Sequence, residues 1–220
     1  MQPQLIARDL CQSFRMGSRR IEVLRGISIE VAPGEIIFIC GASGAGKTTL
    51  LYTLAGLERP ESGTVEFEGR NLYNGPAAAG ARFRNKKMGF VFQGYFLLPE
   101  LTALENVLLP GMIGRTSTKK AAEESLAAVG LADRMQHLPA ELSGGEQQRV
   151  AIARAMTNDP DIIFADEPTG NLDSKTGDAI VDLLMNLARE RQKSLVIVTH
   201  DSGLATRGDR ELHIKDGRIQ

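Results

Sequence analysis

A glycine-rich segment at residues 41–48 carries the first side chains that could do chemistry. Its sequence, GASGAGKT, fits the pattern G-x-x-x-x-G-K-[S/T], in which successive backbone N–H groups surround a phosphate group. Lys47 would place a positive charge at the outer phosphates, and the Thr48 hydroxyl would be a ligand for Mg²⁺. A glycine-rich turn can match this pattern by accident, but its neighbours in the sequence favour a nucleotide site.

The segments on either side have the character that such a loop requires. Residues 36–40 are uniformly apolar and predict a buried strand. Residues 49–55 place leucines at helical spacing, and Gly56 is positioned to end the helix. A strand, a glycine-rich turn and a helix N-terminus together form an anion-binding site, because the positive end of the helix dipole adds to the backbone N–H groups.

Polar residues also follow three other apolar segments that predict buried strands. These segments are residues 88–92, 162–165 and 195–199, followed by Gln93, by Asp166 and Glu167, and by His200. In an open α/β sheet, ligands bind beyond the carboxyl ends of the strands. We therefore expect these side chains to lie around the phosphates held by the loop.

Each of these side chains has a chemical role that suits phosphate hydrolysis. Asp166 suits Mg²⁺ bound through a water opposite Thr48, and Glu167 suits a general base for the attacking water. His200 would hydrogen-bond the γ-phosphate and that water, and Gln93 would contact both the metal and the water. An Asp-Glu pair is often only a helix cap and a lone histidine is often structural, but the combination with a phosphate loop favours function.

A second helix start has anion-binding character. Ser143 and Glu146 have the spacing of a capping box, and Gly144 and Gly145 form a turn before an apolar-rich helix. Upstream of the phosphate loop, Phe14 is an aromatic residue that could stack on a nucleotide base, if it is exposed.

The remaining elements must position these residues. We expect a hairpin within residues 4–31 that turns at 16–18, an alternating strand at 64–68, a loop marked by residues 74–76 and Gly80, and a closing hairpin at 211–219. Residues 94–157 lack strand signals and predict an inserted helical subdomain, including a helix from Thr118, its N-cap, to residue 129. A further amphipathic helix is expected at residues 176–191.

Composition sets limits on the class of protein. The chain has 220 residues, 42% hydrophobic and 24% charged, which is ordinary for a globular protein with a full core. A formal net charge of −1 gives no general attraction for nucleic acid, and two cysteines give no disulfide framework. Without a signal peptide or an apolar run of about 20 residues, we expect a protein that reaches a membrane only through a partner.

Across its whole length the chain resembles the nucleotide-binding subunits of ABC transporters. Residues 41–48 look like the Walker A motif, Gln93 the Q-loop, residues 142–147 the ABC signature, 162–167 Walker B, 171–173 the D-loop and His200 the H-loop. The resemblance implies an α/β P-loop (RecA-like) ATPase with an antiparallel β subdomain. It further implies a single domain, with residues 1–93 and 158–220 as the ATP-binding core and 94–157 as the helical signature subdomain.

The resemblance also implies ATP and Mg²⁺ as cofactors and assigns the site residues. The expected catalytic residues are Glu167, His200 and Gln93, and the expected Mg²⁺ ligands are Thr48, Gln93 and Asp166. The expected nucleotide contacts are Phe14, Gly41, Ala42, Ser43, Gly44, Ala45, Gly46, Lys47, Thr48, Thr49, Ser143, Gly144, Gly145 and Glu146. In this family ATP lies between the Walker A motif of one subunit and the signature of another, so a second copy of the chain is an expected partner.

Within the family, residues 84–93, 97–107 and 165–173 resemble the group of lipoprotein-releasing (LolD-type), macrolide-export (MacB-type) and cell-division (FtsE-type) ATPases. Within this group, the short segments at residues 14–17 and 138–143 favour resemblance to the lipoprotein-releasing ATPases. The departures are Thr48 where serine is commoner and Cys40 where valine is frequent, and neither removes a required group.

Three classes of function compete. The first is an ATPase motor on the cytoplasmic face of the inner membrane that docks on a membrane permease through residues 93–107. The second is a soluble ABC ATPase acting on DNA or ribosomes, which usually carries two cassettes or long coiled coils that this chain lacks. The third is a non-hydrolysing binding module, which would be expected to lack Glu167 or His200. A GTPase is disfavoured because residues 85–88, NKKM, lack the aspartate needed for guanine.

Overall fold

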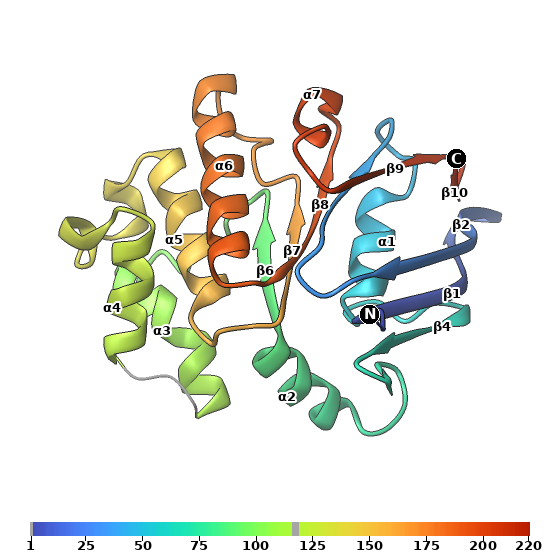
Figure 1. Ribbon diagram of the computed structural model, residues 1–220, viewed down its shortest axis with the longest axis horizontal. Helices are drawn as coiled ribbons and strands as arrows, with labels where there is room; N and C mark the ends of the chain where they lie inside the picture. Colours follow the sequence, from blue (N-terminus) through green and yellow to red (C-terminus); the bar gives the residue numbers. More distant parts are fainter. Residues whose placement is uncertain (1, 116–118) are drawn as a thin grey trace. The chain divides into compact units, whose positions relative to one another are not determined.

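The computed structural model describes residues 2–115 and 119–220, which form two compact units (Figure 1). The first unit comprises the residues up to Gly80 together with Ser194–Gln220. The second unit is Ala81–Lys193. Expected site residues lie in both units.

The first unit contains an antiparallel sheet in the order β2-β1-β4-β5. Its strands are β1 (Leu5–Met16), β2 (Arg19–Val31), β4 (Ser62–Phe67) and β5 (Arg70–Asn71). The predicted hairpin is confirmed, because β1 pairs with β2 from Leu5↔Val31 to Met16↔Arg19 around a turn at Gly17, whose φ is 62°. Such a left-handed conformation suits glycine, which has no Cβ to clash.

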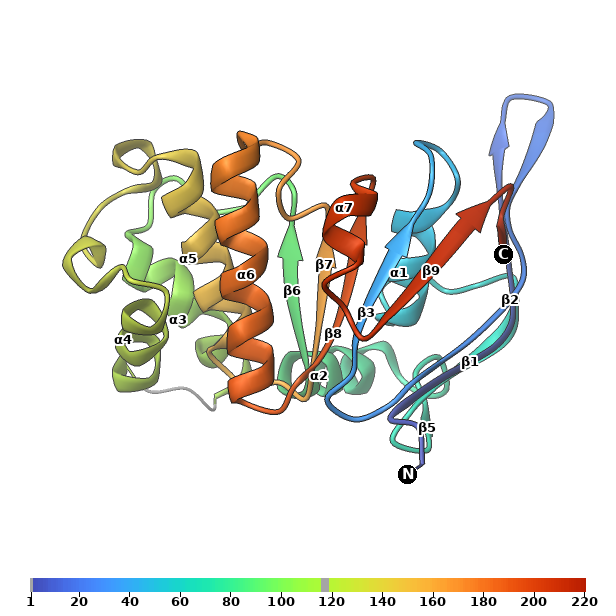
Figure 2. The same ribbon diagram turned by 45° about the horizontal axis from the view of Figure 1, so that its top comes forward.

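A parallel set of strands forms the other part of the first unit. Strand β3 (Ile36–Cys40) lies between β8 (Ser194–Thr199) and β9 (Arg210–Lys215), and β10 (Arg218–Ile219) pairs antiparallel with β9 (Figure 2). All side chains of β3 and β8 are buried, which is the continuous apolar pattern of a strand covered on both faces. Helix α1 (Lys47–Leu54) starts from the loop after β3 and ends before Gly56, as predicted, and the short α7 (Ser202–Ala205) follows β8.

The second unit combines two parallel strands with most of the helices. Strands β6 (Met88–Phe92) and β7 (Ile162–Asp166) pair in parallel. The helices are α2 (Ala77–Lys87), which contains the boundary between the units, α3 (Ala103–Gly114), α4 (Lys119–Ala128), α5 (Gly144–Met156) and α6 (Ser174–Glu190), with 3₁₀ turns at Ala132–Arg134 and Pro139–Glu141. Helix α5 is central, because it packs against α3, α4, α6 and β6.

Three elements differ from the sequence-based expectation. The predicted loop is present at residues 74–76, but its extension to Gly80 is wrong, because Gly80 lies inside α2. No residue of α2 is buried, so the helix has no apolar stripe to reveal it. Strand β5 and helix α7 are short elements that no pattern indicated. The predicted N-cap Thr118 lies outside the described residues, while Gly130, with φ 73°, follows α4 as expected.

The described part of residues 94–157 contains helices and turns but no strand, as the sequence predicts. Among the described helices, none combines the length and apolar character needed to cross a membrane.

Candidate functional site

The phosphate loop joins β3 to α1 through a backbone that only glycine fits at two points. A Cβ on Gly41 would lie 2.3 Å from the Ile214 carbonyl oxygen, and one on Gly46 would lie 2.9 Å from the Val23 carbonyl oxygen. Gly46 is also the N-cap of α1, with φ 100°, and it offers no side chain to the first N–H groups of the helix. The N–H groups in the first turn of a helix point beyond its own hydrogen-bond ladder, so they suit an anion.

Lys47 lies within this loop. Its side chain is 5% exposed, and Nζ donates to the carbonyl oxygens of Gly41, at 2.9 Å, and Ala42, at 3.1 Å. A buried ammonium requires such partners. The two carbonyl groups therefore hold the positive charge of Lys47 within the phosphate loop.

The strand register places His200 beside the phosphate loop. Cys40 of β3 pairs with Thr199 of β8 in a parallel ladder, so Gly41 and His200 leave adjacent strands at the same edge. The thiol of Cys40 is buried, and that burial, followed by the negative charge of Glu211, raises its pKa to about 12. Cys40 is therefore a small apolar packing residue here and not a nucleophile.

In the second unit, a corresponding register brings Gln93 and Glu167 together. Phe92 of β6 pairs with Asp166 of β7, so Gln93 and Glu167 both follow directly from paired residues. Asn171 fixes Gln93 from the other side: its Nδ2 donates to the Gln93 carbonyl oxygen at 2.9 Å, and Gln93 Nε2 donates to Asn171 Oδ1 at 3.3 Å.

Defined contacts hold the backbone turn that follows Asp166. Glu167 has φ 43°, in the left-handed region that non-glycine residues rarely occupy and that often marks functional sites. Its carbonyl oxygen accepts the N–H of Gly170 at 3.0 Å. The next residue, Pro168, accepts a 2.7 Å hydrogen bond from Nε2 of the fully buried Gln148 on α5. Helix α5 thus supports the turn that carries both carboxylates.

The start of α5 has the predicted capping box. Ser143 Oγ accepts the N–H of Glu146 at 3.3 Å, while Glu146 Oε2 accepts the N–H of Ser143 at 2.8 Å and its hydroxyl at 2.7 Å. The Ser143 hydroxyl, followed by its backbone N–H, lowers the pKa of Glu146. Gly144 and Gly145 are both closely approached, since Cβ atoms there would lie 3.1 Å from the Tyr95 hydroxyl and 2.8 Å from Thr176 Cγ2.

Arg154 is a partly buried cation near the site whose contacts the sequence does not reveal. It lies on α5 and donates to the carbonyl oxygens of Phe96, at 2.5 Å, and Tyr95, at 2.6 Å. Both residues have positive φ, 58° for Tyr95 and 47° for Phe96, so Arg154 secures a strained turn directly after Gln93. Burial lowers the pKa of Arg154. Long-range contacts to backbone oxygens leave no sequence pattern, which is why this residue was missed.

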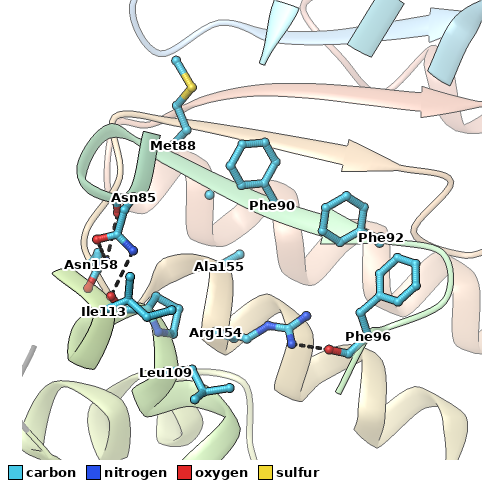
Figure 3. A pocket seen from close by; sticks show the side chains of 12 residues that line it. Asn85, Met88, Phe90, Phe92, Phe96, Leu109, Ile113, Arg154, Ala155 and Asn158 are labelled. Carbon is cyan, nitrogen blue, oxygen red and sulfur yellow. Dashed lines mark hydrogen bonds between the residues drawn. The ribbon is translucent and has the colours of Figure 1, made fainter. Parts of the chain in front are cut away.

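An apolar pocket of about 380 Å³ lies on this side of the second unit (Figure 3). Phe90, Phe92 and Phe96 lie along one side of it and Leu109 and Ile113 along the other. At one end Asn85 Nδ2 donates to the Pro110 carbonyl oxygen at 3.0 Å. Ile113 is 76% exposed and Phe96 is 65% exposed, so the pocket presents apolar side chains to its surroundings.

The candidate metal ligands are hard oxygen donors, which is the chemistry that Mg²⁺ prefers. Thr48 offers a hydroxyl, Asp166 a carboxylate and Gln93 an amide oxygen. Among the described residues, no group of three or more His, Cys, Asp or Glu side chains forms a metal site by itself. This donor set fits a Mg²⁺ ion that also binds nucleotide phosphates and water, as Mg²⁺ commonly does.

The expected site residues fall into two groups. Phe14, the phosphate loop with Thr49, and His200 belong to the first unit. Gln93, Asp166, Glu167 and the helix start at Ser143, Gly144, Gly145 and Glu146 belong to the second. Within each unit, paired strands bring the groups that follow them to one edge: the loop with His200, and Gln93 with the two carboxylates.

Comparison with known proteins identifies relatives over nearly the whole chain. The family described as "ABC transporter" matches residues 24–170. The "Lipoprotein-releasing system ATP-binding protein LolD" of Syntrophotalea carbinolica is 52% identical over 96% of this chain and 94% of its own length. The protein of the same name from Syntrophus aciditrophicus is 48% identical over 96% of this chain and 96% of its own length. That from Geobacter metallireducens is 50% identical over 96% of this chain and 95% of its own length.

Solved structures of ABC transporter cassettes are also similar to this chain. The chain superimposes with a TM-score of 0.90 and 39% identity on the ATP-binding cassette MJ0796, solved as a dimer in a post-hydrolysis state bound to ADP and Pi, covering 98% of this chain and 96% of that one. It also resembles cbiO1 of Clostridium perfringens, part of the cbiONQ ABC transporter complex, with a TM-score of 0.87 and 26% identity over 100% of this chain and 88% of that one.

Proposed function

The chain belongs to the ABC transporter ATPase family, and we propose that it is the ATP-hydrolysing motor of a transporter that releases lipoproteins from the inner membrane. The three LolD relatives support the transported class, because they match almost end to end. The observation that carries the ATPase assignment is the pairing Phe92↔Asp166, which places Gln93 and Glu167 side by side after adjacent strands.

Each residue then has a role in hydrolysis. The loop at residues 41–49, which includes Lys47, binds the phosphates of ATP, and Phe14 stacks on the base. Glu167 accepts a proton from the attacking water, while His200 and Gln93 orient that water toward the γ-phosphate. Thr48, Asp166 and Gln93 hold Mg²⁺, which neutralises charge on the phosphates.

The signature helix supplies the other side of the nucleotide from a second copy of the chain. Ser143, Gly144, Gly145 and Glu146 form a capped helix start with anion-binding character. The dimeric MJ0796 cassette supports a homodimer, and the position of the signature leads us to infer a head-to-tail arrangement. In this arrangement the chain is one ATPase domain with residues 94–157 as its helical signature subdomain.

The apolar pocket in the second unit is the docking site for a permease segment. Phe92 and Phe96 line the pocket on either side of Gln93 in the sequence (Figure 3). A permease segment bound there would therefore contact the part of the chain that carries Gln93. Exposed apolar side chains such as Ile113 favour a protein partner over solvent. With such a permease as its partner, the chain would lie peripherally at the cytoplasmic face of the inner membrane. Macrolide export and cell division remain the alternatives within the family group.

Purification of the tagged chain from its native host tests the function. We expect a membrane permease to co-purify and MgATP hydrolysis by the complex. Ile113→Asp should release the permease while the isolated chain keeps its ATPase activity, and Leu57→Asp, an exposed apolar position outside the pocket, should have no effect. Recovery of ribosomes or DNA in place of a permease would instead support the soluble ATPase class.

A further inference from the structure

The hairpin of β1 and β2 extends beyond the strand that supports its base. Strand β1 pairs with β4 only up to Cys11↔Ser62, but it continues to pair with β2 as far as Met16↔Arg19 (Figure 2). An isolated two-stranded ribbon is marginally stable in water. Strand β2 is held at its inner part, where the Arg25 N–H donates to the Gly217 carbonyl oxygen at 2.9 Å. The outer part of the hairpin, residues 12–22, forms an arm that needs another support if Phe14 is to have a fixed position.

The two faces of the arm differ in character. Phe14 pairs with Ile21, and Met16 lies two residues further along the same face. These side chains are 41%, 42% and 72% exposed, so the face is apolar and open. Ser13 pairs with Glu22, and Arg20 lies two residues from Glu22, so the opposite face is polar.

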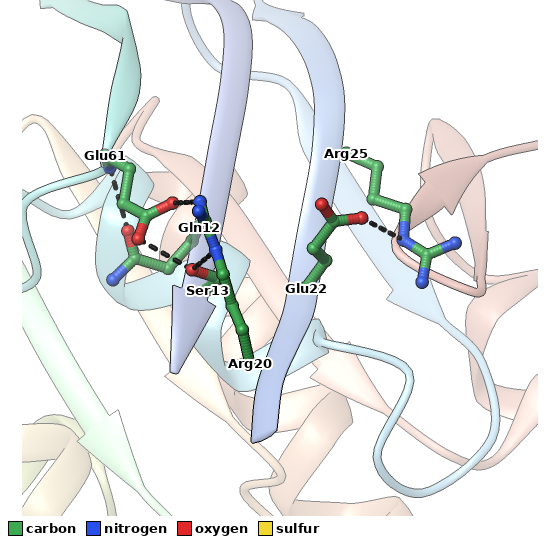
Figure 4. Close-up of polar contacts among 6 residues, drawn as sticks. All are labelled: Gln12, Ser13, Arg20, Glu22, Arg25 and Glu61. Atoms are coloured by element: carbon green, nitrogen blue, oxygen red, sulfur yellow. Dashed lines mark hydrogen bonds and ion pairs between the residues drawn. The ribbon is translucent and has the colours of Figure 1, made fainter. Parts of the chain in front are cut away.

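A network of hydrogen bonds on the polar face ties the arm to the residue before β4 (Figure 4). Arg20 donates from Nη2 to Glu61 Oε2 at 2.7 Å and from Nε to Ser13 Oγ at 2.8 Å. Ser13 Oγ donates to Glu61 Oε1 at 2.6 Å. The Glu61 N–H is bound twice, by the Cys11 carbonyl oxygen at 3.0 Å and by Gln12 Oε1 at 2.9 Å.

This network closes a ring across both strands of the arm. Ser13 directly precedes Phe14, and Arg20 directly precedes Ile21, the partner of Phe14. Both carboxylate oxygens of Glu61 are used, one by each strand, so Glu61 limits rotation of the arm about its base. The hydrogen bond from Ser13, and then the charge of Arg20, lower the pKa of Glu61, so the carboxylate stays ionised at neutral pH.

We propose that Arg20, Ser13 and Glu61 are positioning residues that hold Phe14 for stacking on the base of the bound nucleotide. The inference rests on the proposed function, because Phe14 is assigned to the base there. The three residues do not touch the nucleotide. Their effect is to remove motion of the arm that the bound state would otherwise have to restrict, which improves affinity by preorganisation.

The test compares ATP with inorganic tripolyphosphate, a ligand that has the phosphates but no base, by calorimetry on the purified chain with Mg²⁺. Phe14→Ala should weaken ATP binding by about tenfold, the size of a lost stacking contact, and leave tripolyphosphate binding unchanged. Arg20→Ala should weaken ATP binding by about three- to fivefold, as expected for an exposed charge pair, again without an effect on tripolyphosphate. In ATPase assays the KM should rise while kcat stays constant.

A double-mutant cycle separates positioning from a direct contact. In the Phe14→Ala background, Arg20→Ala should cause no further loss, because the aromatic ring that it positions is absent. If Arg20→Ala does not fold, Ser13→Ala tests the same network and should weaken ATP binding only when Phe14 is present. Arg20→Lys should recover part of the ATP affinity that Arg20→Ala loses. Arg19→Ala removes an equal charge from the same arm outside the network and is the matched control.

Two results would overturn the inference. Equal losses for ATP and tripolyphosphate would make the network a general stabiliser of the fold, and additive effects of Phe14→Ala and Arg20→Ala would make it independent of the ring. Absence of any ATP binding by the unaltered chain would instead refute the proposed function, so the two failures are distinguishable.

Discussion

At the residue scale, the turn after β7 is the feature that most favours the proposed catalytic role of Glu167. Glu167 has a left-handed φ that costs conformational energy, and it is held there by the Gly170 N–H and by the contact of Gln148 with Pro168. Gly170 is packed so closely that a Cβ would lie 2.5 Å from Gln93 Nε2. This strain and packing hold the backbone of the Glu167 turn beside Gln93, where we propose that Glu167 is the general base.

Glu167→Gln should therefore separate binding from hydrolysis. The variant keeps the size and hydrogen bonds of the side chain but cannot take a proton, so turnover should fall by about 10²-fold or more while ATP affinity is retained. Steady-state ATPase assays and equilibrium nucleotide binding measure the two effects. Glu190→Gln, at the end of α6, is the control, and turnover of Glu167→Gln at the rate of the unaltered chain would refute the role of general base.

At the scale of elements, close packing of β6 on α5 determines where Gln93 lies. Gly89 makes this approach possible, because a Cβ there would be 2.6 Å from the Ala155 carbonyl oxygen of α5. The same helix starts at the signature residues and holds Gln148 and Arg154 against the turns after β7 and β6. One helix therefore supports the signature, Gln93 and the Glu167 turn together.

Gly89→Ala should destabilise the chain by about 1–3 kcal/mol, the usual cost of inserting a methyl group into a packed interior. Gly94→Ala is the matched control, since its Cβ would meet only the Phe96 ring at 3.7 Å, and it should change stability by less than about 0.5 kcal/mol. Urea unfolding followed by circular dichroism measures both. Equal stability of the two variants would contradict the packing argument.

Three helices of the second unit start with carboxylate caps, which makes its stability sensitive to acid. Hydrogen bonds from Thr102, Ser143 and Thr176 lower the pKa values of Glu105, Glu146 and Asp173 respectively. A carboxyl group with a lowered pKa in the folded state stabilises fully above its usual pKa of 4.5 for glutamate. That stabilisation is lost as the pH falls through the lowered value.

The free energy of unfolding should therefore decrease as the pH falls below about 4.5, and Glu105→Gln should show a smaller decrease because glutamine can cap but cannot titrate. Urea unfolding at several pH values measures the slope. Glu124→Gln, on the exposed part of α4 and outside any cap, is the control. An unchanged slope in Glu105→Gln would show that the α3 cap does not contribute.

At the scale of the whole molecule, the site residues come from two compact units, and the signature helix has no phosphate loop in its own unit. The related MJ0796 cassette is solved as a dimer. We therefore expect activity to depend on association of two copies of this chain.

The ATPase activity of the isolated chain should rise faster than linearly with protein concentration, because a shared site forms only in the dimer. Assays at nanomolar to micromolar enzyme, with inert carrier protein to control for adsorption, measure this. Size-exclusion chromatography of Glu167→Gln with ATP should show a dimer. Strict proportionality, combined with a monomer by chromatography, would contradict a shared site.

The sequence by itself determined the local elements and the identity of the chemical groups. Strands β3, β6, β7 and β8, the phosphate loop and the Ser143–Glu146 cap follow from apolar runs, glycine spacing and a four-residue cap pattern, all of which act over short stretches of chain. Helix α2 escaped prediction because it buries no residue and so has no periodic pattern.

Only the tertiary structure decided which of these groups meet. The registers Cys40↔Thr199 and Phe92↔Asp166 join segments that are far apart in the chain. Contacts between distant segments also support the strained backbone of Glu167 and form the hydrogen bonds of Arg154 to Tyr95 and Phe96. The Arg20–Ser13–Glu61 network is a further contact of this kind. Contacts of this kind depend on how separate segments pack, and packing leaves no periodic signal in the sequence of any one segment.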